Sequence, residues 1–361
     1  MYLSVLGRQP EISLAELEAL FSDVQPIFPR LATFNSRQTP DINKLGGQMK
    51  LATRLNQKPL DFLVNLPDGK ITLGISDYSK NASRKTATME ALKLKKILVR
   101  LGRSVRVVEN RDAMLSTATS LHNGLSGKND RKVELIKLNS DWYRVIGVQD
   151  VDAYARRDQA RPARDAKVGM LPPKLAQILI NLCGPLSAHA RVLDPFCGTG
   201  VVLQEAMLMG CTAYGTDISE KMVDYSERNL KHFRFTEYQV EVGDATSFTW
   251  QPPIDAVACE GYLGKPMSTV PAIMALKREQ QICRDIVLSF LRNLYSQITS
   301  GTPVTIAIPA WLRENGTYSR LEILDEIENL GYNDNNKSRE GLLYFRDGQI
   351  VARDIIILRK K

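Results

Sequence analysis

The segment best suited to bind a ligand is a short apolar strand that leads into an acidic residue and a glycine-rich turn, Val192–Gly200 (VLDPFCGTG). Glycine lets a backbone turn sharply and approach a ligand where any Cβ would clash. Turns of this kind, between a strand and a helix, bind ligands in open α/β sheets. The segment matches neither the Gly-x-x-x-x-Gly-Lys-Ser/Thr phosphate loop nor a full Gly-x-Gly-x-x-Gly. It therefore predicts close packing against an uncharged part of a nucleotide-type cofactor.

Two further carboxylates follow predicted strands. The strand 212–216 ends in Asp217, about 20 residues after Asp194, the spacing at which a carboxylate accepts both ribose hydroxyls. The strand 239–243 ends in Asp244, which can read an adenine edge together with neighbouring amides. A single Asp after a strand is usually a helix cap. Three of them, each after a strand of one sheet, favour a shared ligand.

The motifs Asp-Pro-Phe-Cys-Gly-Thr-Gly, Thr-Asp-Ile-Ser and Gly-Asp-Ala resemble those of Rossmann-like methyltransferases that depend on S-adenosylmethionine (SAM). More narrowly, the chain resembles the THUMP-containing tRNA guanine-N2-methyltransferases that act at guanosine 10. Three other stretches support this likeness, 1–21, 157–182 and 343–358. The resemblance implies SAM as cofactor, with Asp217 at the ribose, Asp244 at the adenine and Asp194 at the methionyl end. The full set of implied cofactor contacts is Asp194, Phe196, Cys197, Gly198, Gly200, Asp217, Ile218, Asp244 and Ala245.

The catalytic motif departs from the family pattern, which is Asp/Asn-Pro-Pro-Tyr/Phe at the end of the fourth strand. Here that strand ends in Cys-Glu-Gly-Tyr-Leu-Gly, and alignment on Gly264 puts Glu260 at the acidic position. We expect Glu260 to accept a hydrogen from the substrate amine and Tyr262 to stack on a flipped base. The extra methylene of Glu260 moves its carboxylate outward, and Gly261 makes the loop less fixed than two prolines. The alternative is that Glu260 is an ordinary strand-end acid and the site is inactive.

A basic segment lies between Lys80 and Arg111, in a chain whose net charge is +8. Most charge runs are solvated helix faces. This one extends through a helix, a turn and a strand, which favours contact with a phosphate backbone. The predicted RNA-binding residues are Lys80, Arg84, Lys85, Lys95, Lys96, Arg103 and Arg106.

Cysteine and histidine usage indicates a reducing compartment without a metal site. The five cysteines are widely spaced in apolar contexts, only three histidines occur, and no zinc-ligand spacing is found. The sequence has neither a long apolar span nor the pattern of a secretory signal at its start. We therefore expect a cytoplasmic protein that does not associate with membranes and binds no metal.

The predicted organisation has four parts, and the predicted fold class is α/β. An N-terminal α+β domain and a THUMP-like RNA-binding domain precede a linker and a methyltransferase domain, with bounds 1–65, 66–150, 151–167 and 168–361. From residue 190 onward strands alternate with helices, which implies a mostly parallel sheet. The runs 342–346 and 353–358 have a hairpin pattern, typical of a Rossmann-like methyltransferase sheet whose last strand is antiparallel.

The predicted function is methyl transfer from SAM to the exocyclic N2 of a guanosine in tRNA. Two alternatives stay open, a catalytically inactive protein that binds SAM and tRNA, and a DNA amino-methyltransferase. We expect a monomer, and no docking signal indicates the small activator subunit that eukaryotic relatives use. The sequence leaves the nucleotide position and the number of methyl groups open.

Overall fold

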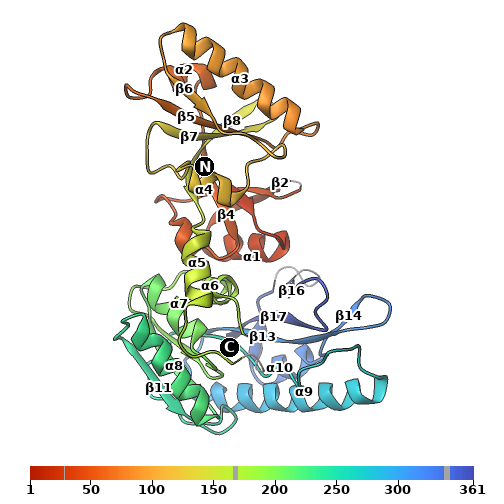
Figure 1. The fold of residues 1–361 in the computed structure, drawn as a ribbon. Helices are drawn as coiled ribbons and strands as arrows, with labels where there is room; N and C mark the ends of the chain where they lie inside the picture. The colour runs from red at the N-terminus through yellow and green to blue at the C-terminus, as the bar shows by residue number, and fades with distance from the viewer. Residues whose placement is uncertain (28, 166–169, 337–341) are drawn as a thin grey trace. The chain divides into compact units, whose positions relative to one another are not determined.

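The strands form two sheets, one in each of two units of the chain (Figure 1). This computed structural model describes residues 1–27, 29–165, 170–336 and 342–361. The first unit comprises Met1–Pro10, Phe21–Asn43 and Gly47–Ala153. The second comprises Glu11–Leu20, Lys44–Gly46 and Tyr154–Lys361.

The first unit is built on an eight-stranded mixed sheet of order β2-β3-β1-β4-β8-β7-β5-β6. Its strands are β1 (Tyr2–Leu6), β2 (Ser22–Ile27), β3 (Leu31–Asn35), β4 (Gln48–Arg54), β5 (Ile71–Asp77), β6 (Val105–Val107), β7 (Lys132–Leu138) and β8 (Asp141–Val148). Its helices are α2 (Pro59–Val64), α3 (Arg84–Arg100) and α4 (Thr117–His122), and the short 3-10 helix η1 (Ile42–Lys44) lies where the chain passes to the second unit. Antiparallel pairing of β4 with β8 joins the segments before and after residue 65. Strands from both sides of the predicted boundary at residues 65 and 66 thus belong to one continuous sheet. The division of the first unit into two domains stays a prediction.

Helix α3 begins at Arg84 because Ser83 caps it. The Ser83 hydroxyl accepts from Thr86 N at 3.1 Å, and Ser83 N donates to Thr86 Oγ1 at 2.9 Å, a reciprocal arrangement that satisfies two otherwise unpaired amides. Residues at helical spacing face the sheet and are buried, namely Ala87, Ala91, Leu94 and Leu98. The lysines and arginines between them consequently point outward.

The second unit contains a nine-stranded sheet, with the order β11-β10-β9-β12-β13-β17-β15 and with β14 and β16 added to β13 and β17. The strands are β9 (Arg191–Asp194), β10 (Thr212–Asp217), β11 (Tyr238–Val242), β12 (Ala256–Glu260), β13 (Pro303–Leu312), β14 (Tyr318–Ser319), β15 (Tyr332–Asp334), β16 (Leu343–Tyr344) and β17 (Val351–Lys360). Strands β9 to β13 pair in parallel, whereas β17 is antiparallel to β13. This confirms the predicted α/β sheet and its reversed last strand.

Helices cover both faces of this sheet, which is why its strands are apolar on both sides. The helices are α1 (Pro10–Leu20, from Glu11 onward), α5 (Val151–Gln159, from Tyr154 onward), α6 (Pro173–Leu182), α7 (Val201–Met209), α8 (Glu220–His232), α9 (Ile273–Tyr295) and α10 (Leu324–Asn329). Helices α6 and α7 pack against one face through Val192, Ala256 and Ala307. Helix α9 packs against the other through Leu193 and Val257.

Helix α1 packs with the second unit, although the sequence assigned it to an N-terminal domain. Ile12 is buried in the core that α6 and α7 form. The Glu16 carboxylate accepts from Gly46 N at 2.9 Å and from Asn181 Nδ2 at 2.7 Å. A buried carboxylate needs such donors, and here they come from α6 and from the segment 44–46.

Within the described ranges, no helix has both the length and the apolar character that crossing a bilayer requires. The same residues contain no group of three or more His, Cys, Asp or Glu side chains that suits a metal ion. All five cysteines are buried free thiols.

A buried ion pair joins β4 and β7 in the first unit. Lys50 Nζ donates to Glu134 Oε1 at 2.5 Å, and the two side chains are 2% and 0% exposed. The hydroxyls of Ser76 and Ser120 each donate to Glu134 at 2.6 Å. Both oxygens of the buried carboxylate therefore have donors.

We predict that Lys50→Met destabilises the first unit by about 3–5 kcal/mol, because it leaves the Glu134 charge buried without a counter-charge. Hydrogen exchange of the β4 and β7 amides in increasing urea measures this. Adding Glu134→Gln to the same variant removes the charge and keeps an acceptor for the serines, so it should restore most of the loss. Equal stability of the wild type and Lys50→Met would contradict the prediction.

Candidate active site

The glycine-rich turn after β9 is held tightly against α8. Gly198 and Gly200 have φ values of +51° and +82°, which side chains rarely adopt. A Cβ on Gly200 would lie 3.0 Å from Ser226 Oγ of α8, and the Ser226 hydroxyl donates to Gly198 O at 2.8 Å. The turn therefore requires glycine and presents bare backbone at the carboxyl end of β9.

Asp217, at the end of β10, is tied to this turn. Its Oδ2 accepts from Gly198 N at 2.9 Å and its Oδ1 accepts from Ser219 N at 2.9 Å. Burial raises the pKa of Asp217, and these two amides oppose the rise. Each oxygen keeps a further lone pair, so the carboxylate is fixed in place and can still accept from a ligand hydroxyl.

Asp194 lies beside Asp217 and Glu260 on one face of the sheet. It pairs with Gly215 of β10, and Asp217 is two residues further along the same face. Asp194 is 2% exposed and accepts from Phe196 N at 3.1 Å. Burial raises its pKa well above the ordinary value, and the charges of Asp217 and Glu260 add to the rise. Burial and mutual repulsion disfavour the ionised form of each carboxylate in such a cluster, and a cationic ligand would stabilise it.

The remaining predicted cofactor residues differ in what they offer. Asp244 is exposed, and its Oδ1 accepts from Thr246 N at 2.9 Å and from Thr246 Oγ1 at 2.8 Å, as a turn-capping Asp does. Its contact with adenine stays a prediction. Ala245 is buried, while Ile218 is 72% exposed and presents an apolar side chain next to Asp217.

Phe196 and Cys197 are oriented toward the protein. The ring of Phe196 contacts that of Phe290 on α9 edge to face, at 5.2 Å between centroids. Burial raises the pKa of the Cys197 thiol well above its usual range, so the thiol stays protonated. Neither side chain is placed to react. We therefore expect that only their backbone atoms and the edge of the Phe196 ring contact the cofactor.

The most important residue that the sequence analysis missed is Arg353 of β17. Its Nε donates to Glu260 Oε1, and the two side chains are 5% and 15% exposed. Burial raises the pKa of Glu260, and the charge of Arg353 and its hydrogen bond lower it. No sequence signal joins residues 93 positions apart; an arginine inside an apolar final strand was the only hint.

The loop after Glu260 is anchored, although Gly261 was expected to make it less fixed. Gly261 N donates to Ala307 O of β13 at 2.9 Å, and Lys265 N donates to Glu279 Oε1 of α9 at 2.8 Å. Between these anchors, Tyr262 is 36% exposed. Its partial burial raises the pKa of the phenol, which therefore stays neutral.

The predicted linker supports the glycine-rich turn. Its first part is helix α5, and residues 166–169 lie outside the described part of the chain. Arg161, whose side chain is fully buried, donates to Thr199 Oγ1 at 3.2 Å. Asn229 of α8 joins the two segments, because its Nδ2 donates to Thr199 O at 2.9 Å and its Oδ1 accepts from Ala163 N at 3.0 Å. Residues Arg161 and Ala163 of this segment therefore also support the turn, and its assignment as a linker stays a prediction.

The predicted RNA-binding residues of the first unit fall into three groups. Lys80, Lys85 and Lys96 are exposed and Lys95 is half-buried. Arg84 and Arg106 are exposed but already bonded, to Glu109 at 2.8 Å and to Asn123 at 3.0 Å. Arg103 donates to the carbonyls of Val64, Leu66 and Pro67. Because these carbonyls occupy its guanidinium, we expect Arg103 to stabilise the fold of this unit, and its assignment to RNA stays a prediction.

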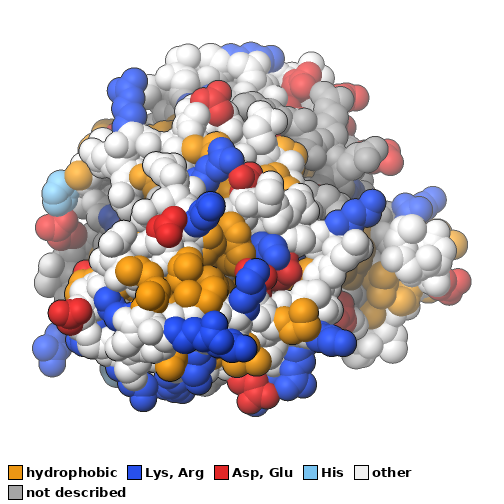
Figure 2. All heavy atoms as spheres, turned by 90° about the horizontal axis from the view of Figure 1, so that it is seen from above, with side chains coloured by type: hydrophobic (Ala, Val, Ile, Leu, Met, Phe, Trp, Pro, Cys, Tyr) orange, Lys and Arg blue, Asp and Glu red, His pale blue; other side chains and the backbone are white. Residues whose placement is uncertain are grey.

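A groove of about 580 Å³ lies beside the edge strand β6 of this unit. Lys70, Lys95 and Arg106 line it together with the hydroxyls of Thr88 and Ser104. Figure 2 shows Lys and Arg side chains around exposed hydrophobic ones on one face of the molecule. On α3 the exposed hydrophobic residues are Met89, Leu92 and Val99.

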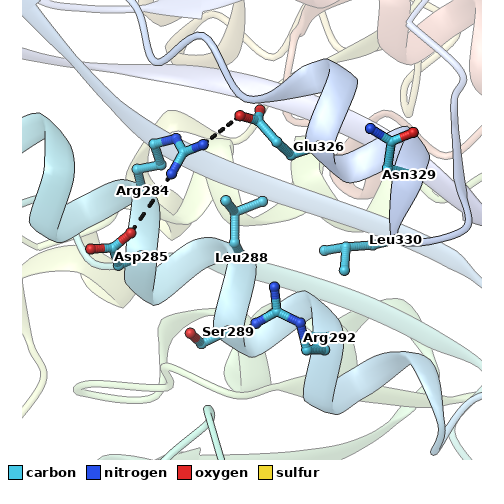
Figure 3. Close-up of a pocket in the computed structure, with 8 residues that line it drawn as sticks. All are labelled: Arg284, Asp285, Leu288, Ser289, Arg292, Glu326, Asn329 and Leu330. Atoms are coloured by element: carbon cyan, nitrogen blue, oxygen red, sulfur yellow. Dashed lines mark hydrogen bonds and ion pairs between the residues drawn. The ribbon is translucent and has the colours of Figure 1, made fainter.

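A second groove, of about 450 Å³, lies between α9 and α10 (Figure 3). Arg284 of α9 forms ion pairs with Glu326 of α10 and with Asp285 of its own helix. None of the predicted site residues lines this groove. The candidate site is therefore the carboxyl edge of β9, β10 and β12.

A family model matches part of the second unit. Residues 186–318 match the family model described as a methyltransferase domain. The match confirms the predicted fold class and supports the predicted cofactor, SAM.

Two curated relatives carry the name tRNA (guanine(10)-N2)-dimethyltransferase. The one from Methanothermobacter thermautotrophicus is 34% identical over 157 residues, which is 43% of this chain and 44% of the relative. The one from Pyrococcus abyssi is 47% identical over 76 residues, 21% of this chain and 22% of the relative. The matched part thus spans less than half the length of either relative.

Among solved structures, TrmN from Thermus thermophilus has a TM-score of 0.50 and is 18% identical, with 100% of this chain and 99% of that chain covered. At this identity the likeness shows a shared fold. The THUMP-like character of residues 66–150 stays a prediction.

We predict that Gly200→Ala weakens SAM binding at least tenfold, because the new methyl group strains a φ of +82° and displaces the turn from Ser226. Gly210→Ala is the matched control. Gly210 ends α7 with a φ of +94°, and its Cβ would have only Lys44 Nζ nearby, at 3.9 Å. Each substitution should cost about 1–2 kcal/mol of stability through backbone strain. Titration calorimetry with SAM should separate them, and equal affinities for both variants would contradict a role of Gly200 in the cofactor site.

Proposed function

We propose that this protein is a SAM-dependent methyltransferase that methylates the exocyclic N2 of a guanosine in tRNA. The observation that carries the proposal is the meeting of Asp194, Asp217 and Glu260 beside a glycine turn at one sheet edge. The names of the relatives support the substrate class, and the basic first unit supports a polyanionic partner.

The residues at this edge fit SAM, which carries positive charge on its sulfonium and on its amino group. The carboxylate cluster around Asp194 favours a cation. The turn leaves bare backbone for close contact, since a Cβ on Gly198 would have only Phe196 O nearby, at 3.9 Å. Asp217 would hold the ribose hydroxyls, and Ile218 would cover one side of the base. When bound, SAM supplies a methyl group activated by the sulfonium.

Glu260 and Tyr262 prepare the substrate amine. The lone pair of this amine is delocalised into the guanine ring, which makes the nitrogen a poor nucleophile. Glu260 accepts one of the N–H hydrogens, and a backbone carbonyl of the 260–264 loop accepts the other, which directs the lone pair toward the methyl donor. Tyr262 stacks on the base, and Glu260 is placed to take the proton that the amine must release. Most of the rate then comes from alignment of the two reactants.

We predict that the purified protein, given methyl-labelled SAM and unmodified tRNA, produces N2-methylated guanosine detectable by nucleoside mass spectrometry. Glu260→Ala should reduce turnover to a small residual rate while SAM still binds, because the Glu260 side chain contacts the amine and Asp194 and Asp217 remain in the carboxylate cluster. Asp217→Ala should weaken SAM binding severely. SAM and tRNA binding without transfer in the wild type would favour a binding protein, and methylation of duplex DNA in preference to tRNA would favour a DNA enzyme.

We predict that Lys85→Ala and Lys96→Ala each weaken tRNA binding. Each should also make the fall of the logarithm of the association constant with the logarithm of the salt concentration less steep, by about 0.7–0.9 in slope. Both side chains are exposed on α3. Arg103→Ala is the control, since it should reduce the stability of the first unit through loss of its carbonyl contacts and leave the salt slope of the folded protein unchanged. Unchanged slopes for both lysine variants would exclude α3 from the tRNA contact.

A further inference from the structure

The strand register brings Glu260 and Arg353 to the same face of the sheet. Glu260 pairs with Ala307 of β13, and Ala307 pairs with Ile355 of β17. Arg353 lies two residues from Ile355, opposite Pro309, so alternation places its side chain on that same face. The carboxylate and the guanidinium therefore approach each other over β13.

The lengths of the two side chains match this crossing. Neighbouring strands are about 4.8 Å apart, so β12 and β17 are separated by roughly 10 Å across β13. Ala307, fully buried between them, is small enough to leave the path clear. An Asp at position 260 would be shorter by one methylene and would leave the Arg353 Nε without its contact.

The pair is largely buried, with 5% of the Arg353 side chain and 15% of the Glu260 side chain exposed. The guanidinium of Arg353 lies 6.0 Å from the centroid of the Tyr344 ring of β16. Among the described residues, Glu260 Oε1 accepts from Arg353 and no donor to Oε2 is found. Oε2 is not one of the fully buried oxygens without a partner, so it keeps some exposure. One oxygen is thus held by the protein and the other is available to a ligand.

We propose that Arg353 is a positioning residue for the methyl transfer. It holds Oε1 of Glu260 so that Oε2 faces the substrate amine, and it substitutes for the rigidity that two prolines give the usual motif. This proposal rests on the proposed function and explains why the acidic residue is Glu and why Gly261 is tolerated.

The location of the pair favours such a role over a purely structural one. A buried ion pair contributes little net stability compared with apolar residues of the same volume. This pair is at the carboxyl edge of the sheet, where Asp194 senses the Glu260 charge. Arg353 also lowers the pKa of Glu260 against the larger effect of burial, and so favours the ionised carboxylate that can accept a hydrogen.

The test compares Arg353→Met and Arg353→Lys with wild type in kcat, KM, SAM affinity and the pH dependence of kcat. Arg353→Met should lower kcat about 10²-fold, the loss typical of a misplacement of about 1 Å. It should also move the acid limb of the kcat profile to higher pH, because the pKa of Glu260 rises without the neighbouring charge. Arg353→Lys keeps a charge, so its acid limb should stay closer to that of wild type while kcat falls. SAM affinity should be unchanged in both.

Arg359→Met is the matched control, because Arg359 lies on the same strand and donates to the carbonyls of Gly301 and Cys183. The acid limb of the kcat profile of this variant should stay at the pH of wild type. In a Glu260→Ala background, adding Arg353→Ala should cause no further loss of residual activity, which keeps the proposal testable if Arg353→Met folds poorly.

The outcomes separate the two proposals. Wild-type kcat and an unmoved acid limb in Arg353→Met, with an active wild type, would overturn the positioning role and leave the methyltransferase function intact. A further loss on adding Arg353→Ala to Glu260→Ala would show that Arg353 acts independently of Glu260. No methyl transfer by wild type would overturn the proposed function, and the positioning role with it.

Discussion

Three carboxylates share one edge of the second sheet, and much of the surrounding structure serves to hold them there. Parallel strands that end at the same edge bring Asp194, Asp217 and Glu260 together whatever their separation along the chain. Ionising three neighbouring, partly buried carboxylates costs free energy, because burial and mutual repulsion both disfavour the charged forms. Burial is the first cause of the raised pKa of each of the three. The site therefore has a strong physical preference for a cation.

The protein limits this cost with specific donors. Backbone amides of the turn donate to Asp194 and Asp217, and Arg353 pairs with Glu260. The turn itself is supported from behind by Ser226, Asn229 and Arg161. These contacts come from α8 and from the segment before α6, so the cofactor site is built by several elements rather than by the glycine motif alone.

The loop after β12 is fixed by other means than the two prolines of the family motif. Two prolines fix a loop by limiting its backbone. Here Gly261 bonds to Ala307, Lys265 bonds to Glu279, and an arginine from the antiparallel strand holds the carboxylate. The stiffness comes from hydrogen bonds across elements, and we infer that it serves the same alignment of amine and methyl donor.

The local motifs in the sequence determined the class of fold and the centre of the site. Asp194, the glycines and Asp217 follow from strand-to-helix turns, whose requirements are short-range and so are written in neighbouring residues. The reversed last strand and the capped basic helix are likewise local patterns. Tertiary structure alone decided the rest: that α1 packs with the second unit, that Arg103 holds carbonyls, that Arg161 supports the turn, and that Arg353 meets Glu260. These contacts join residues that are distant in the chain. Burial and strand register determine which side chains meet, and neither can be read from the identity of one residue.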